Sequence, residues 1–270
     1  MEQQSARTRA SWPVPVVAAL LAISALFLVF RDTDADKPEP SPSPAPVATK
    51  VDLASLKLSS TKTVIKAAPK DPRPDRVPKG TVVHPKRMLA LYDEPDGTAF
   101  AKIGPKQFGD TWLPVITRNQ DWVQVLLPSK PNGSTGWLRS RELTEAHSRF
   151  LIKVHLDSHS LELYERGDKV GTWTVAIGAP ATPTPVGRTF VLGQISDEKQ
   201  PFSPVILPLG SHSDTLDSYG GGPGTVALHG WTDSSVFGKS ISHGCVRVPD
   251  DALDLLRTVP IGTPVMVDKA

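Results

Sequence analysis

The chain has 270 residues, a length that suits two domains of moderate size better than one large domain. Its 39% hydrophobic and 21% charged residues are compatible with packed cores, and a net charge of +2 is too small to indicate nucleic-acid binding. The 27 prolines are too many for folded domains alone and indicate a linker. The single cysteine excludes an internal disulfide.

The N-terminal region is typical of a membrane anchor. Residues 12–30 contain no charged side chain and are long enough to cross a hydrocarbon core of about 30 Å as a helix. Arg7 and Arg9 precede this segment and Asp32 follows it, so residues 1–11 are predicted to be cytoplasmic and the rest of the chain to lie outside the cell. A cleaved signal peptide is the alternative, although no small-x-small site directly follows the apolar segment.

Residues 31–81 are expected to form a proline-rich basic linker. Residues 37–46 read KPEPSPSPAP, a composition that favours extended conformations and cannot bury a core. Residues 50–87 contain ten Lys or Arg and three Asp among scattered prolines. We interpret this part as a solvated linker; loose attraction to an anionic envelope polymer is the alternative.

Residues 82–146 are predicted to form a small β-barrel domain. Apolar segments separated by turn residues occur at 88–92, 112–117, 122–127 and 136–138. The Asn-Gly pair at 132–133 is typical of a hairpin. The order of Trp112, Trp122 and Trp137 is similar to that in bacterial SH3-like domains, and we expect these side chains to pack in a core. The resemblance implies wall or peptide binding; a rigid spacer is equally compatible.

Residues 148–270 form a second β-rich region. Strands are predicted where apolar residues alternate or cluster, at 151–156, 160–164, 170–177, 189–192, 225–229 and 262–267. Helical spacing over residues 249–257, with an aspartate as N-cap, predicts one short helix. We expect His155 and His159 to be ordinary strand and turn residues and His212 to be solvated, without a chemical role.

The only cysteine, Cys245, has the surroundings of a nucleophile. His243 lies two residues before it, and His229 lies 16 positions upstream. A thiol attacks as the thiolate, so it needs a base or positive dipoles that lower its pKa from about 8.5. The two histidines are candidate bases, and Gly244 allows backbone amides to approach a developing oxyanion.

Two other interpretations of Cys245 remain open. Free cysteine is often a buried, inert residue. Alternatively, His229, His243 and Cys245 are all zinc-ligand types, although the separation of His243 from Cys245 is unlike common ligand pairs and no fourth ligand is evident. We therefore expect neither a metal nor a cofactor.

The segment HGWTDSSVFGKSISHGCVR at 229–247 is similar to the catalytic motif of the L,D-transpeptidase family, and the upstream TPVG at 184–187 resembles a turn of that family. The similarity covers roughly residues 148–269. It implies an L,D-transpeptidase-type β-sandwich with a short helix. With the SH3-like β-barrel and the N-terminal transmembrane helix predicted above, the chain is expected to be mainly β.

The resemblance also assigns roles to residues. Cys245 would be the nucleophile, and His229 the general base, oriented by the backbone carbonyl of Gly230. The residues that would support the loop and the oxyanion, or meet a substrate carboxylate, are Ser242, His243, Gly244 and Arg247. Trp231 departs from the small hydroxyl residue that often follows the His-Gly pair in the family, which puts the fit of the donor in doubt.

The implied partners are peptidoglycan stem peptides, a donor tetrapeptide and an acceptor stem, together with carbapenem inhibitors and the membrane. The implied activity forms 3-3 cross-links through a Cys245 thioester, in a single-pass protein of the cell membrane whose catalytic domain faces the wall. Two alternatives remain: an L,D-carboxypeptidase that trims tetrapeptide stems, and a wall-binding protein without catalysis.

Overall fold

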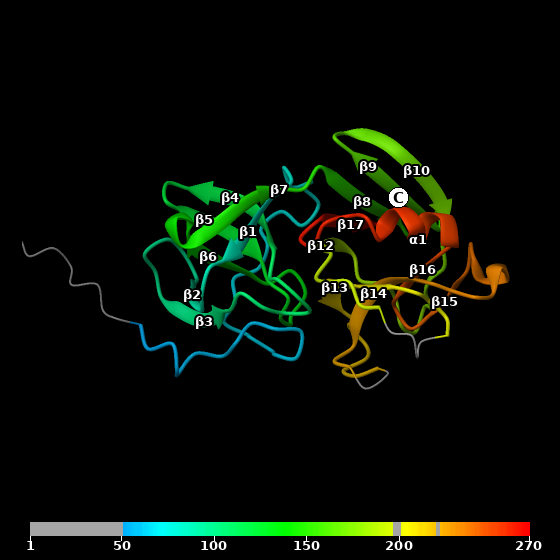
Figure 1. Cartoon of the computed structure of the whole chain (residues 1–270). Coiled ribbons are helices and arrows are strands. Elements are labelled where there is room, and N and C mark those ends of the chain that lie inside the picture. Colours follow the sequence, from blue (N-terminus) through cyan, green and yellow to red (C-terminus); the bar gives the residue numbers. More distant parts are fainter. Residues whose placement is uncertain (1–50, 197–200, 220–221) are drawn as a thin grey trace, which may run out of the picture. The chain divides into compact units, whose positions relative to one another are not determined.

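The computed structural model describes residues 51–196, 201–219 and 222–270, all within one compact unit, Thr49–Ala270. This part of the chain is mainly β, as predicted (Figure 1). It contains no helix that is long and apolar enough to cross a bilayer. The predicted transmembrane segment, residues 12–30, lies outside the described residues.

Seven antiparallel strands form the first sheet, in the order β3-β2-β6-β5-β4-β1-β7. The strands are β1 (Thr81–Pro85), β2 (Leu89–Tyr92), β3 (Ala99–Ile103), β4 (Leu113–Asn119), β5 (Trp122–Leu126), β6 (Thr135–Arg139) and β7 (Leu143–His147). A 3-10 turn, Ser140–Glu142, connects β6 to β7. The predicted β region therefore exists, and its similarity to an SH3-like barrel stays a prediction.

The tryptophans of this region differ in their surroundings. Trp122 is buried, in edge contact with Tyr92 at 5.1 Å between ring centroids, as predicted for a core residue. Trp112 and Trp137 are half-buried. Trp112 lies against Gly262, where an added Cβ would come within 2.9 Å of the tryptophan Cβ. The Trp112 ring also lies 5.3 Å from that of His84 on β1, so Trp112 packs between the first sheet and the second β region.

Residues 51–80 are not the solvated linker that we expected. Ser59, Thr61 and Ile65 are all at most 4% exposed. Isolated bridges attach the segment to the sheet and its loops, at Leu58–Lys102, Val64–Lys130 and Lys70–Ser134. The segment packs through isolated apolar and hydroxyl side chains. These residues form no periodic pattern in the sequence, so the segment resembled a linker.

A buried ion pair joins this segment to strand β12 (Gly187–Phe190). The side chains of Arg188 and Asp71 are only 3% and 2% exposed, and Arg188 also donates from Nη1 to the carbonyl of Arg76 at 2.9 Å. Removal of one partner would leave the other charge buried without compensation. The pair therefore ties residues 71–76 to the strand that follows the Thr-Pro turn.

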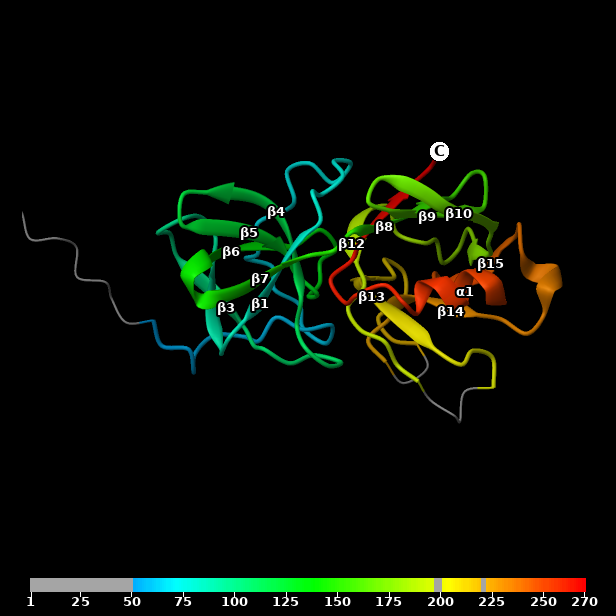
Figure 2. The ribbon, with the colours of Figure 1, turned by 45° about the horizontal axis from the view of Figure 1, so that its top comes forward.

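Three sheets make up the second β region (Figure 2). The five-stranded sheet has the order β10-β9-β8-β17-β12, with β8 (Phe150–His155), β9 (Ser160–Glu165), β10 (Asp168–Thr174) and β17 (Pro264–Asp268). The three-stranded sheet has the order β13-β14-β16, with β13 (Ile206–His212), β14 (Thr225–Gly230) and β16 (Val246–Val248). A short parallel pair consists of β11 (Ile177–Gly178) and β15 (Ser240–Ser242).

One hydrophobic core is shared by the two larger sheets. Ile152 and Val154 of β8 lie in the same cluster as Leu228 of β14 and Val246 of β16, and all four are fully buried. Leu253 of the helix α1 (Asp250–Leu256) completes this core. The arrangement agrees with the β-sandwich that the sequence predicted.

Helix α1 confirms the predicted short helix but not its N-cap. Pro249 occupies the cap position without a side-chain hydrogen bond, and Asp250 and Asp251 lie in the first turn. Acidic side chains there interact favourably with the positive end of the helix dipole, so these aspartates stabilise the helix from inside it.

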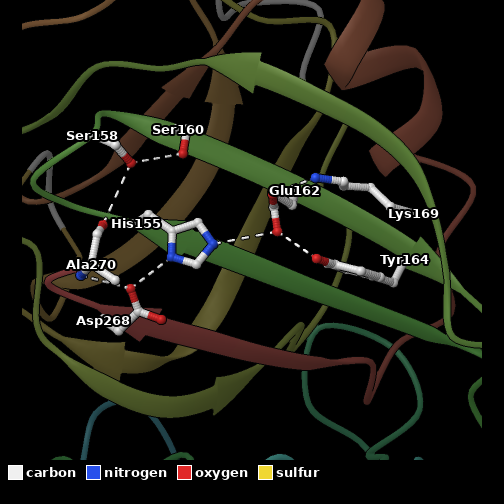
Figure 3. A network of polar contacts seen from close by, with 8 residues as sticks. All are labelled: His155, Ser158, Ser160, Glu162, Tyr164, Lys169, Asp268 and Ala270. Carbon is white, nitrogen blue, oxygen red and sulfur yellow. Dashed lines mark hydrogen bonds and ion pairs between the residues drawn. The ribbon is translucent and has the colours of Figure 1, made fainter.

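A polar network on β8, β9 and β17 surrounds His155 (Figure 3). The imidazole contacts Asp268 at 2.7 Å through Nδ1 and Glu162 at 3.4 Å through Nε2. Glu162 accepts hydrogen bonds from Tyr164 at 2.6 Å and Lys169 at 2.9 Å, and these lower the pKa of its carboxyl to about 2. His155 thus fastens the last strand to its neighbours, in keeping with the structural role predicted for it.

His212 is buried, contrary to the expectation that it is solvated. The residue is 1% exposed, and its Nε2 donates to the carbonyl of Thr61 at 2.9 Å. Its backbone amide and carbonyl both bond the side chain of Asn132, at 2.8 and 2.7 Å. Burial lowers the pKa of this imidazole to about 4. The segments that cover His212 are distant in sequence, so its neighbours in the chain did not predict its environment.

Replacement of Asp71 by Asn tests the buried ion pair. We expect Asp71→Asn to lower the free energy of unfolding by about 3 kcal/mol, because the Arg188 charge stays buried without a partner. Urea denaturation of the full-length chain in detergent measures the change. Asp75→Asn, an exposed carboxylate on the same segment, is the matched control. Equal stability of the two variants would contradict the assigned role of the pair.

The buried His212 predicts an acid-sensitive stability. Its folded pKa of about 4 lies below the usual value of 6.5, so between these pH values the unfolded chain binds a proton that the folded chain does not. The contribution of the neutral His212 to the free energy of unfolding is therefore fully present above pH 6.5. It is lost as the pH falls towards 4, and the loss amounts to about 3 kcal/mol. The wild type should lose about that much more stability than His212→Gln between pH 7.5 and 4. Equal losses of unfolding free energy in the two proteins between pH 7.5 and 4 would contradict the prediction.

Candidate active site

The parallel pairing of β14 with β16 brings the predicted catalytic residues together. In this register Leu228 faces Val246 and His229 faces Arg247. Leu228 and Val246 are fully buried in the hydrophobic core. Because side chains alternate along a strand, His229 lies on the opposite face of this pair of strands. Cys245 directly precedes β16, and the backbone of Ala227 on β14 hydrogen-bonds its thiol.

His229 has the tautomer that a general base requires. Its Nδ1 lies 2.7 Å from the carbonyl of Gly230, and since a carbonyl only accepts, Nδ1 carries the proton and Nε2 has the free lone pair. Burial lowers the pKa of this imidazole to about 4; the Gly230 carbonyl opposes the shift, and the charge of Arg247 adds to it. His229 is therefore neutral at pH 7.

A second hydrogen bond fixes the backbone that carries this carbonyl. The amide of Gly230 donates to Oγ of Ser203 at 2.8 Å, and Ser203 in turn donates to the carbonyl of Val205 at 2.6 Å. A Cβ on Gly230 would lie 3.1 Å from Leu253 and 3.2 Å from the Ser203 hydroxyl. A side chain here would displace Leu253 and Ser203 slightly, so glycine suits this closely packed position.

The loop that carries the cysteine is held by Ser242 and Thr184. Ser242 Oγ accepts from the amide of Gly244 at 3.1 Å and donates to the carbonyl of Cys245 at 2.5 Å. Thr184 Oγ1 donates to the carbonyl of Gly244 and accepts from the amide of Gly178, both at 2.9 Å. Gly244 has φ +111°, a conformation that favours glycine.

Cys245 is a half-buried free thiol. Burial raises the pKa of the thiol, while a hydrogen bond from the backbone of Ala227 and the charge of Arg247 oppose the rise. We expected the surroundings to lower this pKa, and the balance is the reverse. The thiol and the His229 imidazole are therefore both neutral in the resting protein.

Aromatic side chains contact His229 and its neighbours in the site. Phe202 contacts His229 edge-on at 5.1 Å and lies 5.5 Å from Trp231. The guanidinium of Arg247 lies 3.5 Å from the centre of the Trp231 ring. The exposed His243 stacks on Tyr219 at 4.8 Å. Of the two candidate bases, His229 is thus buried and oriented by a hydrogen bond, whereas His243 is exposed.

The predicted zinc alternative gains no support from this arrangement. The described residues contain no group of three or more His, Cys, Asp or Glu side chains placed to hold a metal ion. One nitrogen of His229 is already bonded to Gly230.

The sequence of this region matches a known family. Residues 149–267 match the YkuD family model, described as the L,D-transpeptidase catalytic domain. The predicted resemblance is confirmed. We call residues 148–270 the L,D-transpeptidase-like domain.

Two curated relatives are the YkuD proteins of Bacillus licheniformis and Bacillus subtilis, both named as L,D-transpeptidases. They are 33% and 27% identical to this chain over 119 residues, which is 44% of this chain and 65% of each relative. The match thus spans just under two thirds of the relatives and under half of this chain.

Similar solved structures carry related descriptions. An L,D-transpeptidase from Mycobacterium tuberculosis H37Rv is 16% identical, with a TM-score of 0.39, and the match covers 52% of this chain and 74% of that one. The catalytic domain of the E. faecium L,D-transpeptidase is 24% identical, with a TM-score of 0.35, and the match covers 46% and 100%. At these TM-scores the structures add nothing to the sequence match.

Several residues of the L,D-transpeptidase-like domain were not predicted as part of the site. Thr184 occurs in the TPVG turn, but its two hydrogen bonds to the cysteine loop and β11 depend on tertiary structure. Thr182 donates to the carbonyl of Ser242 at 2.9 Å. Ser203 and Phe202 have no recognisable motif. Thr182 and Thr184 could have been predicted as part of the site only because they lie in or beside the TPVG turn.

Removal of the Thr184 hydroxyl should loosen the cysteine loop. Thr184→Ala leaves the Gly244 carbonyl and the Gly178 amide without a partner, so we expect a loss of about 2 kcal/mol in unfolding free energy. Cys245 should also react faster with iodoacetamide, because the loop that buries it opens more often. Urea denaturation and timed labelling of the full-length chain measure both effects.

Two variants control this experiment. Thr184→Ser keeps the hydroxyl and should restore both properties. Thr232→Ala removes an exposed hydroxyl and should change stability by less than about 0.5 kcal/mol. Wild-type stability and labelling in Thr184→Ala would contradict the role of Thr184.

Proposed function

We propose that this chain is a cell-wall L,D-transpeptidase that forms 3-3 peptidoglycan cross-links through a Cys245 thioester. One observation carries the proposal: a neutral, oriented His229 on β14 lies opposite Arg247 of β16, and the chain's only cysteine directly precedes β16. The match of residues 149–267 to the L,D-transpeptidase catalytic domain supports the choice of substrate.

In the first step, Nε2 of His229 takes the thiol proton as Sγ of Cys245 attacks the carbonyl carbon at the third residue of a donor tetrapeptide stem. This general-base route suits a site in which both groups are neutral at rest. The C–N bond then breaks, His229 returns the proton to the leaving amine, and terminal D-alanine departs. The donor remains as a thioester on Cys245.

The oxyanion of the tetrahedral intermediate requires free amide donors. The amide of Gly244 is already bonded to Ser242, so it does not serve. The amides of His243 and Cys245 have no acceptor among the described residues and are assigned this role. Gly244 therefore shapes the loop, and its two neighbours stabilise the charge.

In the second step, an amine of an acceptor stem attacks the thioester while His229 removes the amine proton. Sγ departs from the carbonyl carbon and regains a proton from His229, which leaves a new amide between two stems. The guanidinium of Arg247, which lies over the Trp231 ring, would meet a carboxylate of the donor. The centre of the Trp231 ring lies 6.0 Å from that of the His229 ring. Trp231 would therefore reduce the space in which the donor stem binds.

The proposed location follows from the sequence. Residues 12–30 would anchor the chain in the cell membrane as a single span, with residues 31–50 leading to the folded part outside. The L,D-transpeptidase-like domain would then reach the wall.

Product analysis tests the proposed activity. We incubate the full-length chain in detergent with disaccharide-tetrapeptide and expect mass spectrometry to detect a cross-linked dimer and free D-alanine. Cys245→Ala should produce neither. Tripeptide without dimer would replace the transpeptidase by a carboxypeptidase, because water would then resolve the thioester.

A carbapenem provides a second measurement on the same site. One similar solved structure is the E. faecium catalytic domain acylated by ertapenem, so ertapenem is the probe. We expect one adduct per chain, located on Cys245 by peptide mapping, and a rate that falls at least about 100-fold in His229→Ala. Absence of an adduct together with absence of products would favour the non-catalytic wall-binding alternative.

A further inference from the structure

Two adjacent cavities in the described part of the chain have walls that contain basic but no acidic residues. The larger has a volume of about 680 Å³ and the smaller about 280 Å³, and both include Val77, Pro78 and Lys79 in their walls. We call them the basic cavities. Neither includes a residue of the candidate active site.

The walls of the basic cavities carry a larger excess of positive charge than the chain as a whole. The basic residues of the two walls are Arg76, Lys79, Arg118, Arg149, Lys153, Arg166 and Arg188. The whole chain, by comparison, has 30 Lys and Arg against 28 Asp and Glu. The cavity walls are therefore basic, although the whole chain has nearly equal numbers of basic and acidic residues.

Acidic residues outside the walls form ion pairs with three of these cations. Arg118 pairs with Glu145, Arg149 pairs with Glu165, and the buried Arg188 pairs with Asp71. The other four, Arg76, Lys79, Lys153 and Arg166, have no acidic partner among the residues that the structure describes. Unpaired like charges lining the same cavities repel one another, and a bound anion relieves that repulsion.

The cavity walls also offer flat apolar surfaces. Phe150 and Tyr164 line the larger cavity, each beside a cation: Arg149 lies 5.3 Å from the Phe150 ring centre and Lys153 lies 4.9 Å from that of Tyr164. Val115 and Ile116 line the smaller one. A ring-shaped ligand that carries an anionic group could contact an aromatic face and a cation at once.

We propose that the basic cavities bind an anionic glycan, a sugar polymer that carries carboxylate or phosphate groups. The larger cavity is in the range of pockets that enclose small organic molecules, about 300–1,000 Å³, so it accommodates a sugar unit. Because Lys79 lines both cavities, neighbouring units of one polymer can occupy them together. The guanidinium groups suit either anion, since their fork matches carboxylate and phosphate alike.

Two other polyanions fit less well. A planar membrane surface meets protruding cations more readily than cations that line cavities. Nucleic acid attracts proteins through an extended positive field, and a chain of net charge +2 has little. The proposal is independent of catalysis by Cys245, because the cavities and the site share no residue.

Removal of three unpaired charges tests the site. The test variant is Arg76→Gln, Lys79→Gln, Arg166→Gln, all exposed positions whose loss leaves the cores intact. The matched control is Lys62→Gln, Lys66→Gln, Lys239→Gln, three exposed lysines outside the cavities. Both variants change the net charge by the same amount, so only the position of the charges differs.

Binding of the full-length chain in detergent is measured by calorimetry at low and physiological salt. The probes are polygalacturonate for carboxylates, phosphomannan for phosphates, and neutral dextran. We expect at least one anionic glycan to bind, more weakly at higher salt, and the test variant to bind it about tenfold more weakly than the control variant. The preferred polymer identifies the anion.

Three outcomes would overturn the proposal: equal binding of dextran, equal loss in both variants, or no binding of either anionic glycan. Stronger binding to phosphatidylglycerol vesicles or to duplex DNA than to either glycan would assign the cavities to that polyanion instead. Thermal unfolding of both variants is measured beside the titrations, and wild-type melting temperatures show that a loss of binding is not a loss of fold.

Discussion

The candidate active site depends above all on the parallel register of β14 with β16. With Leu228 opposite Val246, the core fixes both strands, and the alternation of side chains then leaves His229 on the other face, while Cys245 directly precedes β16. A slip of one residue would move Val246 out of the core. The hydrophobic interior of the sandwich therefore determines the geometry of the reactive groups, although it contains neither of them.

Burial acts on the two reactive groups in opposite directions. It raises the pKa of the Cys245 thiol and lowers that of His229 to about 4, so both effects favour the neutral pair over a thiolate and an imidazolium. In the proposed attack the proton must then move as the bond forms, and the oriented Nε2 of His229 is the group proposed to accept it. The resting thiol is correspondingly less reactive towards oxidants.

The sequence predicted local features better than long-range ones. Alternating residues predicted β8 and β9, and helical spacing predicted α1, because each pattern lies within a few residues of the chain. The cysteine motif predicted Cys245 and His229 through family resemblance. His212, by contrast, is buried by Thr61 and Asn132, which are 151 and 80 residues away in the chain. No local pattern contains such contacts.

The same limit explains why residues 51–80 resembled a linker. Their few apolar side chains have no periodicity, yet Ile65 joins a core that also contains Phe190 and Leu192 from the L,D-transpeptidase-like domain. That core therefore uses residues from both sides of the predicted boundary at residues 147–148. This core and the buried pair of Asp71 and Arg188 make residues 51–80 part of the folded unit. The predicted domain boundary therefore separates the β-sheets, but a hydrophobic core crosses it.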